Sequence, residues 1–96
     1  MNLVYHPEAV NEIESSIDYY NELQDGLGFK FYYELLRSID LIKEYPKTWP
    51  IYYKKTRRIL VNNFPYALIY LVTENKIVIL AAMNCYRKPG YWKKRL

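Results

Sequence analysis

Basic side chains crowd the second half of this 96-residue sequence, and they are the groups best suited to chemistry or binding. Residues 1–45 carry nine acids and three bases, a net charge of −6, whereas residues 46–96 carry one acid and eleven bases, a net charge of +10. This asymmetry indicates an anionic partner, either a nucleic acid or an acidic protein. The alternative is a solvated strand edge that charge protects from pairing. The candidate contact residues are Lys54, Lys55, Arg57, Arg58, Arg87, Lys88, Lys93, Lys94 and Arg95.

Aromatic residues are interspersed among these bases, and tyrosine is the commonest of them, with 12 copies. A phenol can stack on a nucleobase, donate a hydrogen bond or take part in proton transfer. Most tyrosines are expected at the rim of a small core, where the ring is buried and the hydroxyl stays in water. Tyr91 is the exception, because it stands beside Trp92 in the basic tail, and both residues are candidates for target contact.

Composition argues against several other kinds of site. The single cysteine, Cys85, excludes an intramolecular disulfide and a cysteine-cluster metal site, and the single histidine, His6, argues against a histidine zinc site. We therefore expect no metal and no cofactor. The longest aliphatic run, Ile77 to Met83, is far shorter than the ~20 residues that span a bilayer. No charged-then-apolar leader precedes the first segment, so we expect a cytoplasmic protein without membrane contact.

The elements that must position these residues are predicted as one α+β domain over residues 1–96. A short strand at 2–5 precedes a helix that begins at Pro7 and stops before the glycines of 25–28. His6 is expected to cap this helix or to end the strand. A second helix is predicted from about Phe29 to Tyr45, and the short link makes the two helices antiparallel neighbours. A three-stranded antiparallel meander should follow, with strands at 51–61, 66–72 and 76 to about 85.

Side-chain alternation predicts which bases share a face of the meander. Within residues 54–61, Ile59 and Val61 are expected on the helix-covered face, so Lys54 and Arg58 should point to the open face. The meander also brings the residue after the last strand, Arg87, over the same sheet as Arg58.

Three motifs of the basic half, together with the start of the chain, resemble the RelE/ParE superfamily of bacterial and archaeal toxins. These proteins are the toxic halves of type II toxin–antitoxin pairs and are often called plasmid stabilisation proteins. The resemblance covers nearly the whole chain and rests on the order and spacing of the motifs. The motifs are His6-Pro7-Glu8-Ala9, Arg57-Arg58-Ile59-Leu60, Phe64-Pro65-Tyr66-x-x-Ile69-Tyr70 and Arg87-x-Pro89-x-Tyr91-Trp92.

The resemblance implies the RelE/ParE-like toxin fold, a cognate antitoxin as partner and a toxin–antitoxin hetero-oligomer. RelE-like members cleave mRNA on the ribosome, whereas ParE-like members poison DNA gyrase. In the nuclease branch, a base deprotonates the ribose 2′-hydroxyl, arginines stabilise the transition state, and an acid protonates the leaving oxygen. By matching position, the nuclease reading assigns Arg58, Arg87 and Tyr91 as catalytic residues, with Lys54 beside them.

Two positions depart from the nuclease pattern. Ala67 stands where RelE-like nucleases carry an arginine after the middle-strand tyrosine, and Asn84 stands where many relatives carry a histidine. Asparagine does not accept a proton at pH 7, and one missing transition-state donor typically costs ~2.7–4 kcal/mol. We therefore expect a ParE-like toxin that binds its target, with gyrase as the expected target. A RelE-like endoribonuclease and an inactive orphan binding module remain the alternatives.

Overall fold

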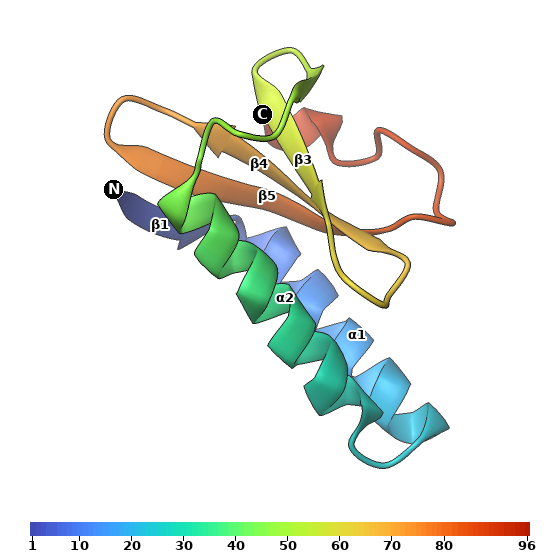
Figure 1. The fold of residues 1–96 in the computed structure, drawn as a ribbon. Helices are drawn as coiled ribbons and strands as arrows, with labels where there is room; N and C mark the ends of the chain where they lie inside the picture. Colours follow the sequence, from blue (N-terminus) through green and yellow to red (C-terminus); the bar gives the residue numbers. More distant parts are fainter.

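The computed structural model describes all 96 residues and shows two helices packed on one face of a five-stranded sheet (Figure 1). The predicted α+β class is therefore confirmed. The sheet has the order β1-β5-β4-β3-β2, in which β1 is parallel to β5 and the other neighbours are antiparallel. The elements are β1 (Asn2–Tyr5), α1 (Pro7–Leu23), α2 (Leu27–Glu44), β2 (Ile51–Tyr53), β3 (Thr56–Leu60), β4 (Tyr66–Val72), β5 (Lys76–Asn84) and a final 3₁₀ turn, η1 (Lys93–Arg95).

The predicted meander is correct only in part, because residues 51–61 form two strands rather than one. Lys54 and Lys55 make a tight turn between β2 and β3, and Lys54 has a positive φ of 51°. The Thr56 hydroxyl closes this turn by accepting from the Tyr53 amide at 3.2 Å and donating to the Tyr53 carbonyl. The sheet thus gains a fifth strand, and Lys54 lies in a turn rather than on the open face of a strand.

The helices follow the local signals closely. Pro7 occupies the first turn of α1, and His6 caps it, since His6 Nδ1 accepts from the Glu8 amide at 3.1 Å. α2 begins at Leu27, two residues before the predicted Phe29. Gly28 allows the close approach of the two helices, because a Cβ there would collide with the Ile17 carbonyl oxygen. The helices form a hairpin whose tip extends beyond the sheet (Figure 1).

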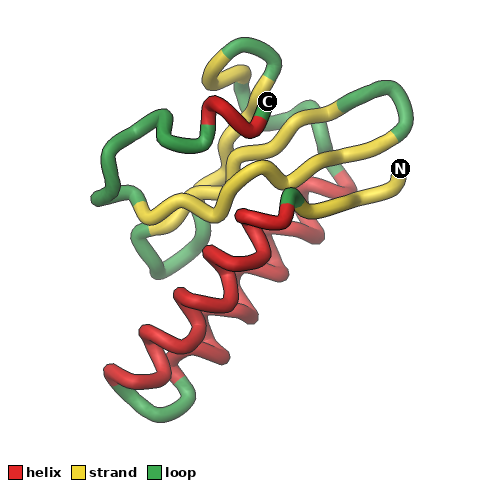
Figure 2. The backbone as a smooth tube through the Cα atoms, turned by 180° about the vertical axis from the view of Figure 1, so that it is seen from behind, coloured by secondary structure: helices red, strands yellow, loops and turns green.

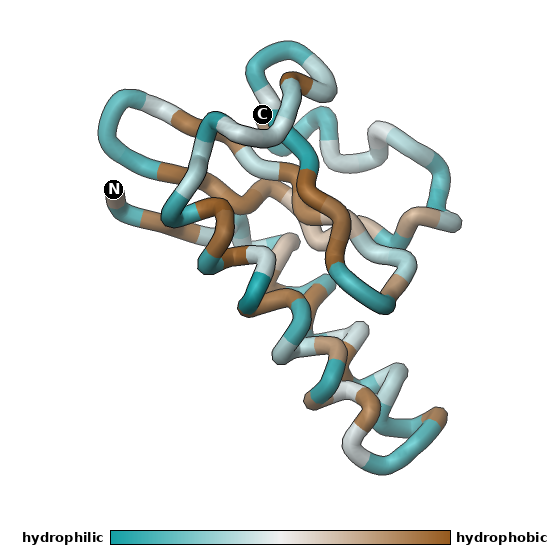
Figure 3. Tube along the Cα trace, in the orientation of Figure 1, coloured by the Kyte–Doolittle hydropathy of each residue, from teal (hydrophilic) through white to brown (hydrophobic).

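The central strands are covered on both faces, which explains why β4 and all but the two ends of β5 are apolar. Figure 3 shows the brown hydrophobic colour along both strands and teal in the turns and the tail. One cluster joins the helices to the near face of the sheet, and a second lies on the far face beneath the C-terminal tail (Figure 2). The first includes Phe31, Leu35, Ile39, Ile42, Leu68, Tyr70 and Ile79, and the second comprises Ala67, Ile69, Leu80, Ala81, Met83 and Trp92.

Neither helix has the combination of length and apolar composition that crossing a bilayer requires.

Candidate target-binding site

The C-terminal tail, residues 85–96, folds back over the sheet face that was expected to be open. Trp92 anchors it: the indole is fully buried, and its ring lies 6.2 Å from the Tyr52 ring and 5.8 Å from the Tyr53 ring. Trp92 is therefore a core residue in this conformation and does not present its ring to a target. The sheet face that was expected to be open is therefore covered by the tail.

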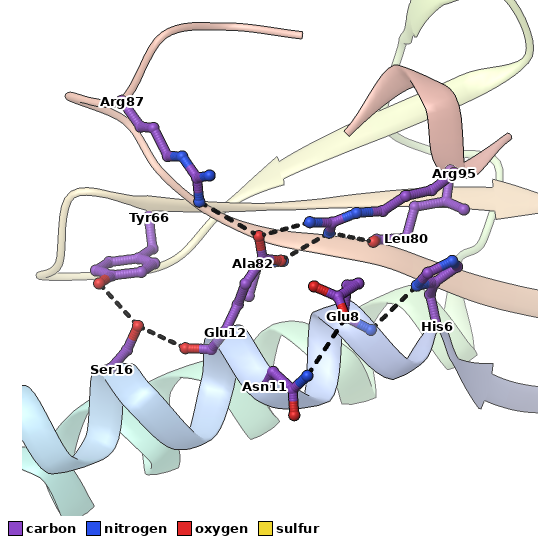
Figure 4. A network of polar contacts seen from close by, with 10 residues as sticks. All are labelled: His6, Glu8, Asn11, Glu12, Ser16, Tyr66, Leu80, Ala82, Arg87 and Arg95. Carbon is purple, nitrogen blue, oxygen red and sulfur yellow. Dashed lines mark hydrogen bonds and ion pairs between the residues drawn. The ribbon is translucent and has the colours of Figure 1, made fainter. Parts of the chain in front are cut away.

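A second anchor joins the tail to α1 through a partly buried ion pair (Figure 4). Both terminal nitrogens of the Arg95 guanidinium, Nη1 and Nη2, donate to the Glu12 carboxylate, at 2.9 and 3.0 Å, and the Ala82 amide donates to the same carboxylate at 3.1 Å. Arg95 also donates to the Leu80 carbonyl at 2.9 Å. The Glu12 hydrogen bond raises the pKa of Arg95 further above its ordinary value. This two-pronged geometry holds the tail in place and removes Arg95 from the free basic surface.

Arg87 is the basic residue that this network presents to solvent. Its Nη1 lies 3.7 Å from Glu12 Oε2, and its guanidinium stacks 3.7 Å from the centre of the Tyr91 ring. The side chain is nevertheless 56% exposed. Arg87 is thus oriented from two sides while its remaining N–H donors stay available to a partner.

Tyr91 lies below Arg87 with its hydroxyl buried. The hydroxyl makes no hydrogen bond of good geometry, and the Glu12 carboxylate is the polar group that lies close to it. Burial, and then the neighbouring Glu12, hold the pKa of Tyr91 well above its ordinary value of 10.0. A buried phenol with a raised pKa is a poor proton donor, and its hydroxyl is shielded from a substrate.

The remaining basic residues, in the β2–β3 region and in the tail, fall into three groups. Arg58 points to the far face as predicted, with its guanidinium 4.3 Å from the Tyr52 ring centre. Arg57 is structural, because its Nη1 donates to the Trp49 carbonyl at 2.6 Å and to the Lys47 carbonyl at 3.2 Å. Lys54 and Lys55 are exposed in the β2–β3 turn, and Lys88, Lys93 and Lys94 are exposed in the tail. Lys93 links the two regions, since its ammonium lies 4.1 Å from the Tyr53 ring centre.

The structure therefore brings some predicted residues together and assigns others to the interior. Arg58, Arg87 and the exposed lysines border the far face, whereas Trp92, Arg95 and Arg57 hold the fold together. Whether the exposed set contacts a target stays a prediction.

A comparison with solved structures places this architecture. A chain of the "Chromosomal ParDE TA system from P. aeruginosa" superposes with a TM-score of 0.71 at 16% sequence identity, over 88% of this chain and 95% of that one. This chain has a ParE-like fold. The resemblance to the RelE/ParE superfamily is thus confirmed at the level of the fold. No protein-family model matches the sequence, and no curated protein matches it either.

The two departures from the nuclease pattern have structural reasons within this ParE-like fold. Ala67 is fully buried in the cluster that contains Trp92, so a long arginine side chain would have no room while the tail is packed. Asn84 ends β5 and caps the following turn, because its Oδ1 accepts from the Tyr86 amide at 2.9 Å. Both residues therefore serve the packing of the tail.

Glu12 is the residue that reasoning from the sequence missed. The sequence marks it only as one of several acids in the early turns of α1, and its partner Arg95 is 83 positions away. No periodicity connects the two. The one signal for a structural role is its position: Glu12 lies on the same face of α1 as the buried residues Ala9, Ile13 and Ser16. An acid on a buried face needs a partner, but the sequence does not show which one.

Proposed function

We propose that this chain is the toxin of a type II toxin–antitoxin system and that it arrests growth by binding an essential target, DNA gyrase. A cognate antitoxin neutralises it in a hetero-oligomeric complex in the cytoplasm. The ParE-like fold supports the assignment to a toxin–antitoxin system. The basic surface on one half of the chain supports an acidic or polyanionic partner.

The observation that favours binding over catalysis is the state of Tyr91. An endoribonuclease needs a base for the 2′-hydroxyl and an acid for the leaving oxygen. The Tyr91 hydroxyl is buried, burial raises its pKa, and Arg87 covers the ring. The position of Ala67 beneath the tail removes the further arginine that such a site would use. Arg58 and Arg87 then act as contact residues for a target surface.

Two assays on the purified full chain separate the proposed activities. We expect the chain to inhibit supercoiling of relaxed plasmid by gyrase, and we expect Arg87→Ala to weaken this inhibition at least ten-fold. Lys43→Ala, a change of the same charge on α2, is the matched control and should inhibit like the parent chain. Unchanged gyrase activity at a large excess of the chain would contradict the proposal.

The second assay addresses the RelE-like alternative, which the exposure of both Arg58 and Arg87 favours. Primer extension on a translated message should show no new cuts when the chain is added to a translation reaction. Cuts that vanish in Arg87→Ala would replace the proposed binding activity with ribosome-dependent mRNA cleavage.

A further inference from the structure

A groove of about 620 Å³ lies at the β2–β3 edge of the sheet, far from the Glu12–Arg95 network. One wall is α2, a second is the segment that leads into β2, and the third is β3 with the turn that follows it. Residues that line it include Arg37, Leu41, Trp49, Tyr52, Arg58 and Leu60.

The third wall is an unpaired strand edge. β2 pairs only with Thr56 and Arg57, so residues 58–60 have β4 on one side and no strand on the other. The Val61 amide donates to the Tyr66 carbonyl at 2.9 Å. Because an antiparallel strand directs alternate residues toward each neighbour, the N–H and C=O of Leu60 point away from β4 and toward the groove. Such an edge is a template for another extended chain.

Charge at the groove favours an acidic occupant. Arg58 is exposed over the Tyr52 ring, and the Arg37 side chain is 62% exposed. The acid in the groove, Glu34, is already engaged, because it lies 3.9 Å from Arg37 and accepts from Asn63 Nδ2 at 3.2 Å. Its side chain is only 11% exposed. The lining of the groove thus contains two arginines and one carboxylate, and its net charge is positive.

Apolar side chains in the groove lack a cover. Leu41, Ile51 and Leu60 are 43%, 53% and 63% exposed, although each borders residues of the core. Leu41 projects from α2 on the helix side of the sheet, whereas Leu60 shares the far face with Arg58, so an occupant that covers both must contact both sides of the edge.

We infer that this edge binds an extended segment of a partner protein in which apolar and acidic residues alternate. The segment adds a strand beside residues 58–60 through the backbone groups of Leu60. Alternate side chains of a strand point to opposite faces, so its apolar residues meet Leu41 and Ile59, while its acidic residues lie on the face that Arg58 shares with Leu60. Identification of the partner as the antitoxin rests on the proposed function. The existence of the unpaired strand edge is independent of that function.

A synthetic peptide of seven residues that alternates Val and Glu, blocked at both ends, tests the edge directly. Added to the ¹⁵N-labelled full chain, it should shift the amide signals of residues 58–62 and of Leu41 most strongly. The same peptide with its central Val replaced by Pro is the control and should bind at least ten-fold more weakly, because it lacks a ladder donor.

Two pairs of variants identify the contacts. Leu60→Pro removes the outward N–H without touching the β4 ladder, and we expect about a ten-fold loss of peptide affinity, whereas Leu60→Thr keeps the N–H and should retain binding through the backbone. Arg58→Glu should also weaken binding about ten-fold. Lys43→Glu makes the same charge change on α2 outside the groove and should leave affinity unchanged, so the test holds even if the proline variant fails to fold.

Three results would overturn the inference. The first is a set of shifts centred on another surface, and the second is equal binding of the proline peptide. The third is self-association of the chain that Leu60→Pro abolishes, since this would assign the edge to a second copy. The proposed function fails separately: a chain that binds the peptide but leaves growth and gyrase unaffected keeps the edge and loses the toxin assignment.

Discussion

On one face of the sheet, Leu35, Ile39 and Ile42 of α2 join Leu68 and Ile79 in a continuous aliphatic core. On the other face, a short tail without a long element rests on one indole and one ion pair. On the helix side, side chains at regular helical spacing are buried, so the stabilisation is distributed over many small contacts. The tail side concentrates its attachment at Trp92 and Glu12. The difference indicates that the helix side serves stability, while the tail side serves to position Arg87.

Removal of a large side chain from the helix side should have the largest effect. Phe31 is fully buried and packs against the rings of Tyr20, Phe64 and Tyr66. We expect Phe31→Ala to lower the free energy of unfolding by about 4 kcal/mol, because it leaves a cavity among these rings. Urea denaturation followed by circular dichroism measures the loss. Tyr32→Ala, an exposed neighbour on α2, is the control, and equal losses for both variants would refute a dominant helix-side core.

Loss of the Glu12 charge should come next. Glu12→Gln leaves Arg95 buried beside a neutral amide, and removal of one partner of a buried pair costs about 3 kcal/mol. Because Trp92 and this ion pair are the main attachments of the tail, we expect part of this loss to appear as local release of the tail. Trypsin should therefore cut after Lys93 or Lys94 at least ten-fold faster than in the parent chain.

Glu14→Gln provides the comparison for the tail experiment. Glu14 is an exposed acid of α1, two positions after Glu12. The tail of this variant should be cut at the parental rate. If Glu12→Gln also left the cutting rate unchanged, the ion pair would not be what holds the tail.

Alkaline pH should weaken the tail side more than the helix side. Folding raises the pKa of Tyr91, so the protonated phenol contributes stability that is complete below pH 10 and is lost as pH rises above it. The loss should approach about 1.4 kcal/mol per pH unit for this one proton. Tyr91→Phe should flatten the decline measured by denaturation at several pH values, whereas Tyr33→Phe, in an exposed residue of α2, should not. Burial also raises the pKa of Tyr5, Tyr20 and Tyr70, so a shallower decline remains.

The smallest effect on stability should come from Arg87→Ala. Its side chain is more than half exposed and its ion pair with Glu12 is long, so we expect a loss of at most about 1 kcal/mol. The same variant should lose target inhibition. A large loss of stability instead would make Arg87 a structural residue and erase the difference between the two faces.

Local patterns predicted much of the fold. Pro7 and His6 mark the start of α1, and the aliphatic spacing of α2 predicts its buried side. The run Tyr66–Val72 has the predicted strand bounds. The division of residues 51–61 was missed, because a two-residue turn of lysines carries none of the glycine or asparagine signals of such turns.

The candidate site was predicted only as a set of residue types. Arg58 lies where strand alternation places it, but alternation says nothing about Trp92 or Arg95, whose positions depend on where the tail crosses the sheet. Such a contact couples residues far apart in the chain, so its presence depends on how the whole molecule packs.

The sequence by itself determined the α+β class, the helix start at Pro7 and the segregation of charge, because these depend on neighbouring residues and on composition. Only the tertiary structure decided which bases are free. Glu12 captures Arg95 across 83 positions, Trp92 fills the far face above Ala67, and β2 stops short of Leu60. Each of these results from packing between distant segments, where burial and hydrogen-bond geometry select one arrangement among several that the same residue types would permit.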